Sequence, residues 1–231
     1  MNDAVPPSGH MRAARPGRRR EFAPSLTQQC WGFIIGSALF AVGTAPGFHA
    51  VAGTAATNWL CFIGAWFFTA AGLIQLARST PATARIPDST ARRVRPEWMA
   101  AFTQSLGTIA FNVSTTAALI DHNLPAELHY VWSPDAGGSA AFLLSGVLLV
   151  IADSRARGRA FDLRDADWWS AQINLLGCIA FGFSAVGAFL LPGGQDLDPT
   201  LANGGTFIGA ICFLVASAGV LPRRERRGQG P

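Results

Sequence analysis

The sequence predicts an all-α membrane protein in which six helices cross the bilayer. Three observations predict this fold class. Half of the 231 residues are hydrophobic and only 14% are charged, whereas a soluble domain carries about 25% charged residues. Six apolar segments approach the roughly 20 residues that a transmembrane helix needs. The basic residues, all of them arginine, lie outside those six segments.

The six predicted helices have no charged residue and no histidine in their central parts. Tryptophans lie near several of their ends, where an amphipathic ring suits the headgroup region. The predicted spans are 29–48, 58–77, 98–120, 139–152, 168–191 and 206–221, and the short fourth span is expected to begin near Ala136. We therefore expect one transmembrane domain over residues 25–222. It follows a disordered, Arg-rich cytoplasmic tail (1–24) and precedes a short cytoplasmic tail (223–231).

The arginines predict the orientation of the chain. All 18 lie before the first span, between the second and third, between the fourth and fifth, or after the sixth. Because basic residues beside a span stay on the cytoplasmic side during insertion, we expect both termini inside. An alternative is that Arg19-Arg20-Glu21-Phe22 begins a twin-arginine export signal cleaved after residues 50–52. Cleavage there would leave an odd number of spans.

The arginine clusters also bear on the partners of the protein. We expect them to contact anionic lipid headgroups at the cytoplasmic surface of the bilayer. We do not expect a nucleic-acid partner, because the sequence provides no folded basic face on which a duplex could lie. A second copy of the chain or another membrane protein is an expected partner within the bilayer.

The spans resemble one another at a period of about 70 residues, which indicates an internal repeat. Gly-Thr-Ile-Ala-Phe at 107–111 matches Gly-Cys-Ile-Ala-Phe at 177–181, and Gly-Ser-Ala-Leu-Phe at 36–40 matches both more loosely. Among the even-numbered spans, Phe-Ile-Gly-Ala recurs at 62–65 and 207–210, and Gly-Gly pairs at 137–138 and 204–205 also match. The sequence therefore predicts three helical hairpins, at about 25–78, 97–153 and 167–222. Parallel repeats of this kind predict approximate threefold pseudo-symmetry about the membrane normal.

Two stretches of the first hairpin combine apolar residues, a Gly-Ser or Gly-Ala pair, and aromatic residues. They are Phe-Ile-Ile-Gly-Ser-Ala-Leu-Phe at 33–40 and Phe-Ile-Gly-Ala-Trp-Phe-Phe at 62–68. With this pattern the chain between Trp31 and Leu76 resembles the YrhK-like family of small two-span membrane proteins. The whole chain is similar to six-span membrane proteins of actinobacteria that contain such units. The resemblance implies no known activity, substrate or cofactor, and the all-arginine composition favours a bacterial plasma membrane.

Neutral polar residues recur at every fourth position of the third span. They are Gln104, Thr108, Asn112 and Thr116, and Asn174 occupies the position of Gln104 in the fifth span. One interpretation is a polar seam that lines a pathway or a site for a neutral solute. The other is helix packing, in which interhelical hydrogen bonds contribute about 0.6 kcal/mol each. We favour packing, because the polar character fades from one repeat to the next.

The predicted outer loop between the third and fourth spans carries a second candidate cluster. It consists of Asp121, His122, Glu127 and His129. Two histidines and a carboxylate could bind a metal ion, but the spacing of these histidines in a loop is not a recognised ligand pattern. A solvated loop is the preferred interpretation. The four cysteines also lack metal-site spacing, so we assign no catalytic, cofactor-binding or metal-ligating residue.

These observations favour a non-enzymatic membrane protein with a structural or interaction role and no cofactor. One alternative is a transporter or channel for a small neutral solute, which the repeat and the polar seam favour. A third hypothesis is a metal-dependent membrane enzyme at the outer face. The axis of the bundle discriminates between the first two. A dry core of Gly, Ala and Phe favours the first, and a polar cavity at mid-depth favours the second.

Overall fold

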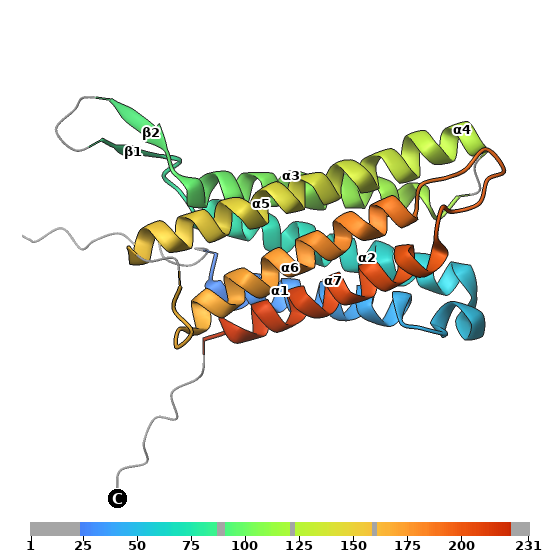
Figure 1. The fold of residues 1–231 in the computed structure, drawn as a ribbon, viewed down its shortest axis with the longest axis horizontal. Coiled ribbons are helices and arrows are strands. Elements are labelled where there is room, and N and C mark those ends of the chain that lie inside the picture. The colour runs from blue at the N-terminus through green and yellow to red at the C-terminus, as the bar shows by residue number, and fades with distance from the viewer. Residues whose placement is uncertain (1–23, 87–90, 121–122, 159–160, 223–231) are drawn as a thin grey trace, which may run out of the picture.

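The computed structural model describes residues 24–86, 91–120, 123–158 and 161–222 as a bundle of long helices lying side by side (Figure 1). The two β-strands in these ranges form a short antiparallel hairpin between α2 and α3. The helices are α1 (Leu26–Thr44), α2 (Phe48–Arg78), α3 (Pro96–Ala117), α4 (Leu124–Glu127), α5 (Ser133–Arg157), α6 (Ala166–Gly187) and α7 (Pro199–Gly219). A π-helical turn (Leu128–Trp132) makes α4 and α5 continuous, and the strands are β1 (Thr83–Arg85) and β2 (Arg92–Val94).

Five helical segments are long and apolar enough to cross a membrane: α1, α2, the continuous α4–α5 segment, α6 and α7. The sixth predicted span corresponds to α3, which is 22 residues long but is not among these five. Its composition is more polar because it carries a set of buried polar side chains: Gln104, Ser105, Thr108, Ser114 and Thr115. The fold is therefore all-helical with five apolar helices of spanning length, one fewer than the sequence predicted.

Several helices begin earlier than the apolar segments predicted. α7 begins at Pro199, because Asp198 accepts hydrogen bonds from the backbone N–H groups of Thr200 and Leu201. Proline at the first helical position and an N-capping carboxylate are both signals of a helix start. α2 begins at Phe48 and bends at Gly53, whose φ of +81° is accessible to glycine at little cost. Hydropathy alone predicts neither the earlier start of α7 nor that of α2.

The long helices form a closed ring. Within each sequence-adjacent pair, α1 packs against α2, α3 against α5, and α6 against α7. Between pairs, α2 packs against α3, α5 against α6, and α7 against α1. The described ends of the chain, at residues 24 and 222, lie at the same end of the bundle as the β-hairpin (Figure 1). We call this the arginine end, since it holds every arginine in the described ranges: Arg78, Arg85, Arg92, Arg93, Arg95, Arg155, Arg157 and Arg164.

A layer of six phenylalanines fills the centre of the ring, one from each long helix. All six are between 2% and 5% exposed, and neighbouring ring centroids lie 5.0–6.4 Å apart. We call this set the phenylalanine layer: Phe40, Phe68, Phe111, Phe142, Phe181 and Phe213. Its rings meet in edge, tilted and stacked arrangements, which are the favourable geometries for aromatic pairs.

Each of these phenylalanines lies four residues after a glycine, and the glycines allow the two helices of a pair to approach closely. A Cβ on Gly107 would lie 2.4 Å from Phe142 Cδ1, and a Cβ on Gly209 would lie 2.6 Å from Phe181 Cδ2. Gly138 contacts Phe111 in the same way. Gly205 instead abuts the backbone of Ser184. The packing counterpart of Gly138 is therefore Gly209, and not the Gly-Gly pair at 204–205 that the sequence match indicated.

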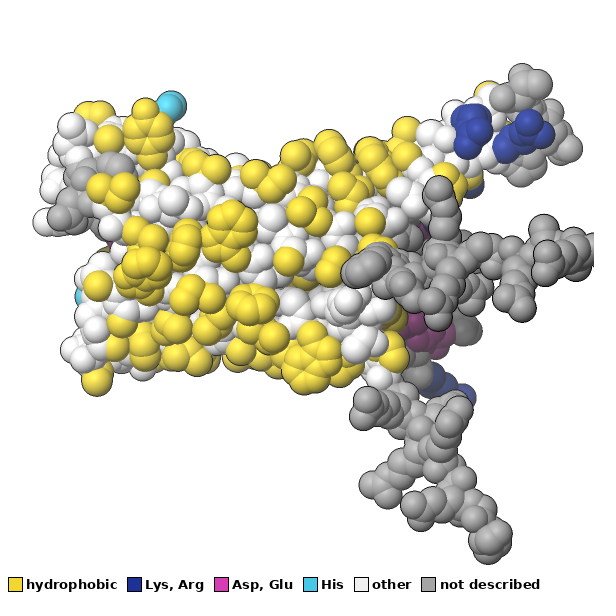
Figure 2. Space-filling view, turned by 180° about the vertical axis from the view of Figure 1, so that it is seen from behind, with side chains coloured by type: hydrophobic (Ala, Val, Ile, Leu, Met, Phe, Trp, Pro, Cys, Tyr) yellow, Lys and Arg dark blue, Asp and Glu magenta, His cyan; other side chains and the backbone are white. Residues whose placement is uncertain are grey.

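The outer surface of the bundle carries a broad belt of apolar side chains between its two ends (Figure 2). Large exposed hydrophobic residues occur on every long helix. α3 follows the same rule, because its exposed residues other than Thr116 are apolar, while its buried residues include the polar set above. The outward residues of α3 are Met99, Phe102, Leu106, Ile109 and Val113, each 38–49% exposed. Such a surface is suited to lipid rather than to water.

Candidate functional site

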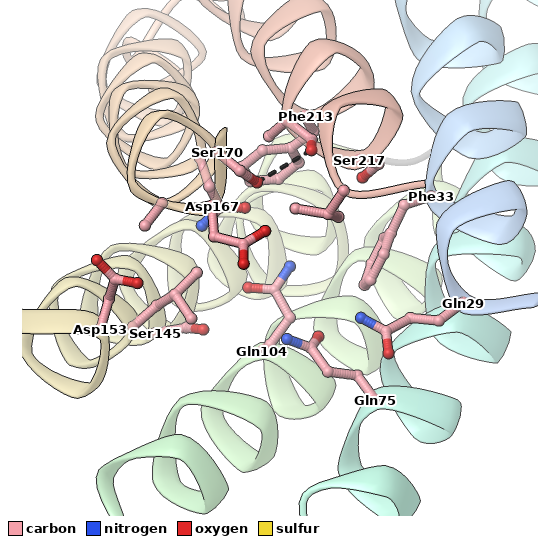
Figure 3. Close-up of a pocket in the computed structure, with 15 residues that line it drawn as sticks. Gln29, Phe33, Gln75, Gln104, Ser145, Asp153, Asp167, Ser170, Phe213 and Ser217 are labelled. Atoms are coloured by element: carbon pink, nitrogen blue, oxygen red, sulfur yellow. Dashed lines mark hydrogen bonds between the residues drawn. The ribbon is translucent and has the colours of Figure 1, made fainter. Parts of the chain in front are cut away.

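A polar cavity of about 220 Å³ lies inside the ring at the arginine end (Figure 3). Residues from all six long helices line it, so we call it the axial cavity. Phe33 and Phe213 contribute apolar walls, and Phe213 also belongs to the phenylalanine layer. The polar lining consists of Gln29, Gln75, Gln104, Ser145, Asp153, Asp167, Ser170, Asn174 and Ser217. The cavity thus ends where the phenylalanine layer begins.

Gln104 is a deeply buried polar residue of the lining. Its side chain is 4% exposed, and its Oε1 atom has no hydrogen-bond partner among the described residues. Gln75 Oε1, on the neighbouring helix α2, is also buried without a partner there. An unsatisfied buried polar group costs about 1–3 kcal/mol. Both amides line the axial cavity, where water or a ligand would satisfy them.

Two serine hydroxyls of the lining donate hydrogen bonds to backbone carbonyls of a neighbouring helix. Ser145 Oγ donates to the carbonyl of Ala100 at 2.8 Å, and Ser170 Oγ donates to the carbonyl of Ala216 at 3.0 Å. A hydroxyl that donates its proton retains acceptor lone pairs. These two serines therefore present acceptors to the cavity, and they also connect α3 to α5 and α6 to α7.

Two carboxylates lie at the cavity and differ in their surroundings. Asp153 accepts hydrogen bonds from Arg157, whose Nε lies 3.0 Å from both carboxylate oxygens. Arg157 also forms an ion pair with Asp165, the N-cap of α6. Asp167 stands in the first turn of α6, and its carboxylate points into the same space as the amide of Gln104 (Figure 3). Among the described residues that line the cavity, the charged side chains are Asp153 and Asp167.

The predicted polar seam divides along α3. Gln104 and Asn174 line the axial cavity. Thr108 is fully buried and donates to the backbone carbonyl of Ser105 at 2.8 Å. Thr116 is exposed and donates to the carbonyl of Asn112 in its own helix at 2.5 Å. A four-residue spacing advances about 40° around the helix at each step, so the four positions rotate from the axis to the outside.

Asn112 occupies the interface between α2 and α3. Its Nδ2 donates to the carbonyl of Ala65 at 3.2 Å and to the hydroxyl of Thr69. Thr69 in turn donates to the carbonyl of Thr108 at 3.2 Å. Asn112 is therefore an interhelical packing residue, and the polar seam does not extend past the phenylalanine layer as one continuous surface.

The predicted outer cluster is described only in part. Asp121 and His122 lie outside the described residues. Glu127 lines a second cavity of about 230 Å³ at the end opposite the arginines, together with Asp135 and Asp196. His129 is exposed, with its ring 4.7 Å from that of Tyr130. No group of three His, Cys, Asp or Glu side chains that could hold a metal ion occurs in the described ranges.

Sequence reasoning missed several residues of the axial cavity. Four of them lie at or beside the ends of predicted spans: Gln29, Gln75, Asp153 and Asp167. Polar residues are common at such ends, so these positions gave no functional signal. A usable signal existed for Gln75, which lies two helical turns after Phe68, as Leu149 does after Phe142. With the phenylalanines as reference points, that register places Gln75 on the axial side of α2.

The chain matches no protein-family model, and it has no significant match among curated proteins or solved structures. The functional argument therefore depends on the geometry of the bundle.

Proposed function

We propose that this chain is a non-enzymatic, six-span membrane protein that is closed across its middle and acts as a structural or interaction component of a bacterial plasma membrane. Its surface supports this proposal, because apolar side chains run along the face of the bundle in Figure 2 and large exposed hydrophobic residues occur on every long helix. α3 counts as the sixth span in the proposal. Its buried residues include the polar set above and its exposed residues other than Thr116 are apolar, which is the pattern that lipid requires.

The proposed orientation has both termini in the cytoplasm. The described arginines gather at one end of the bundle, and loops with clustered Arg are retained on the cytoplasmic side. The proposed architecture is three hairpins around a pseudo-threefold axis. The ring order of the helices and the Gly-x-x-x-Phe pattern in all six helices support it. The first of these hairpins would be the YrhK-like unit.

The observation that carries the proposal is the phenylalanine layer. Six buried rings in mutual contact occupy the axis at mid-bundle. The space enclosed among five of them is too small to hold a water molecule. A pathway for a hydrated solute would need these rings to separate, whereas a static scaffold uses them as its core. A layer drawn from every helix also holds the three helix pairs together.

The test is solute permeation in proteoliposomes that contain the purified protein. We expect glycerol and urea to cross these vesicles at the rate measured for protein-free vesicles of the same lipid, because the axis is closed. The matched variants Gln104→Leu and Thr103→Val should give the same rate as the wild type. A protein-dependent flux that Gln104→Leu reduces and Thr103→Val preserves would overturn the proposal.

A second candidate function is transport of a small neutral solute. The axial cavity favours it, because Gln104 and Gln75 offer unsatisfied amide oxygens on the axis itself. This function would require a second conformation in which the phenylalanine layer opens. The permeation experiment decides between the two candidates, since only the second predicts a flux that depends on Gln104.

A further inference from the structure

We propose that the axial cavity binds a small organic cation rich in hydrogen-bond donors, of the alkylguanidinium or alkylammonium class. The cavity is a dead end below the phenylalanine layer, so binding there does not require a pathway through the bundle. The inference thus goes beyond the proposed structural role and does not depend on it.

Two amide oxygens in the cavity are acceptors without partners among the described residues. Gln104 is 96% removed from solvent contact, and its Oε1 lacks a partner among the described residues, as does Gln75 Oε1. The hydroxyls of Ser145 and Ser170 donate hydrogen bonds to backbone carbonyls, so they can act only as acceptors toward a ligand. A ligand that fills this space gains most if it brings several N–H donors.

The second argument is charge. Asp167 points into the cavity beside the Gln104 amide (Figure 3). Arg157, which contacts the lining residue Asp153, forms ion pairs with Asp153 and Asp165. Arg78 lies outside the lining and donates to Gln29 Oε1 at 2.7 Å. This contact gives an example, at the cavity edge, of a guanidinium bound by an amide of the lining. A cation is therefore favoured over a neutral or anionic ligand.

The third argument is size and the apolar wall. A cavity of about 220 Å³ has room for about seven water molecules at roughly 30 Å³ each, or for a ligand of a few heavy atoms. Phe33 and Phe213 contribute aromatic rings to the lining. A cation near an aromatic face gains further attraction. A planar guanidinium with a short alkyl group combines the donors, the charge and an apolar end that this lining complements.

The test is isothermal titration of the detergent-solubilised full chain with methylguanidinium, and with urea as its neutral, donor-rich counterpart. We expect saturable one-to-one binding of methylguanidinium and about tenfold weaker binding of urea, since a charged hydrogen bond is worth more than a neutral one. Gln104→Leu and Asp167→Asn should each weaken methylguanidinium binding about tenfold or more. Thr103→Val, one residue away and bonded only within its own helix, should leave it unchanged.

Thermal unfolding of each variant establishes that it is folded before titration. The cation proposal fails if methylguanidinium shows no saturable binding up to about 100 mM, which corresponds to a negligible affinity. It also fails if both variants bind as the wild type does, or if urea binds equally well. Equal binding of urea would identify a neutral-solute site instead. The proposed closed scaffold is judged separately by permeation, so binding without flux supports both ideas and flux overturns only the scaffold.

Discussion

The phenylalanine layer and the axial cavity are built from the same six helices but differ in composition. In the layer every helix contributes the same residue type, and the space among five of the rings is too small for a water molecule. Two helical turns earlier in α1, α3 and α6, the residues on the axial side are Phe33, Gln104 and Asn174. The uniform positions build the packed core, whereas the proposed cation binding uses positions at which the helices differ in sequence.

The largest expected effect comes from opening a void in the layer. Phe142 is 2% exposed and contacts rings from four other helices. In soluble cores a Phe→Ala change lowers the free energy of unfolding by about 3–5 kcal/mol. We expect Phe142→Ala to lower it by an amount near the lower end of that range, because detergent replaces water around the unfolded chain. Phe183→Ala, at a site 57% exposed, is the matched control and should cost far less. Denaturant titration in micelles measures both, and equal losses would contradict a packed layer.

The second prediction concerns the glycines beside the layer. Gly107→Ala places a Cβ 2.4 Å from Phe142 Cδ1 and 3.0 Å from the carbonyl oxygen of Gly138, so the helices must separate. We expect a loss of about 1–3 kcal/mol from overpacking. Gly182→Ala meets no atom within 4 Å and should be neutral or stabilise α6 by up to about 1 kcal/mol. Thermal unfolding of the two variants checks the difference, and a tolerated Gly107→Ala would show that the helix pair is loose.

A third prediction addresses the cavity and has the opposite sign. Gln104→Leu removes a buried amide whose oxygen lacks a partner among the described residues. We expect the variant to be more stable than the wild type by about 1 kcal/mol in the absence of ligand, because an unsatisfied polar group is replaced by an apolar one of similar size. Thr103→Val should change stability less. A marked loss of stability in Gln104→Leu would show that the amide is a structural hydrogen-bonding residue.

The smallest expected effect lies outside both regions, in the loop between α6 and α7. Burial raises the pKa of the Asp196 carboxyl above its ordinary value of 3.8. A raised pKa means that the fold favours the protonated carboxyl over the charged one. The stability that the protonated carboxyl contributes is complete below pH 3.8 and is lost as the pH rises through the folded-state pKa. We expect Asp196→Asn to unfold at a slightly higher temperature than the wild type at neutral pH and at the same temperature below pH 3.8. Melting curves across this range measure it, and a constant difference at all pH values would exclude the ionisation as the cause.

The sequence predicted the helical fold and the approximate position of each long helix, because apolar length is a strong signal. It predicted Gln104 and Asn174 as polar positions of interest, since polar residues are rare in spans. It could not place Asn112 or Thr116 correctly relative to the axis, because a four-residue spacing drifts around a helix and its direction depends on tertiary packing. Hydropathy is an average over all sides of a helix. It therefore could not show that α3 combines a set of buried polar residues with an outward apolar face.

The axial cavity as a whole was beyond sequence reasoning for a different reason. Its lining joins residues from six helices, and Gln29, Asp153 and Asp167 are far apart along the chain. Each of them alone is an ordinary polar residue near a helix end. Only the ring order of the helices brings them to one space. The Gly-x-x-x-Phe spacing gives the register of all six helices, but the matched stretches of the sequence contain it only in the first, third and fifth spans.

The most direct test of the central claim is the accessibility of single cysteines on either side of the phenylalanine layer. The background replaces Cys30, Cys61, Cys178 and Cys212 by alanine, and a membrane-impermeant thiol reagent is applied to one side of sealed proteoliposomes at a time. Ser217→Cys reports on the axial cavity, and Ser114→Cys reports on the cavity at the opposite end. The account predicts that each is modified from its own side alone. Modification of either position from both sides would show an open axis and contradict the account.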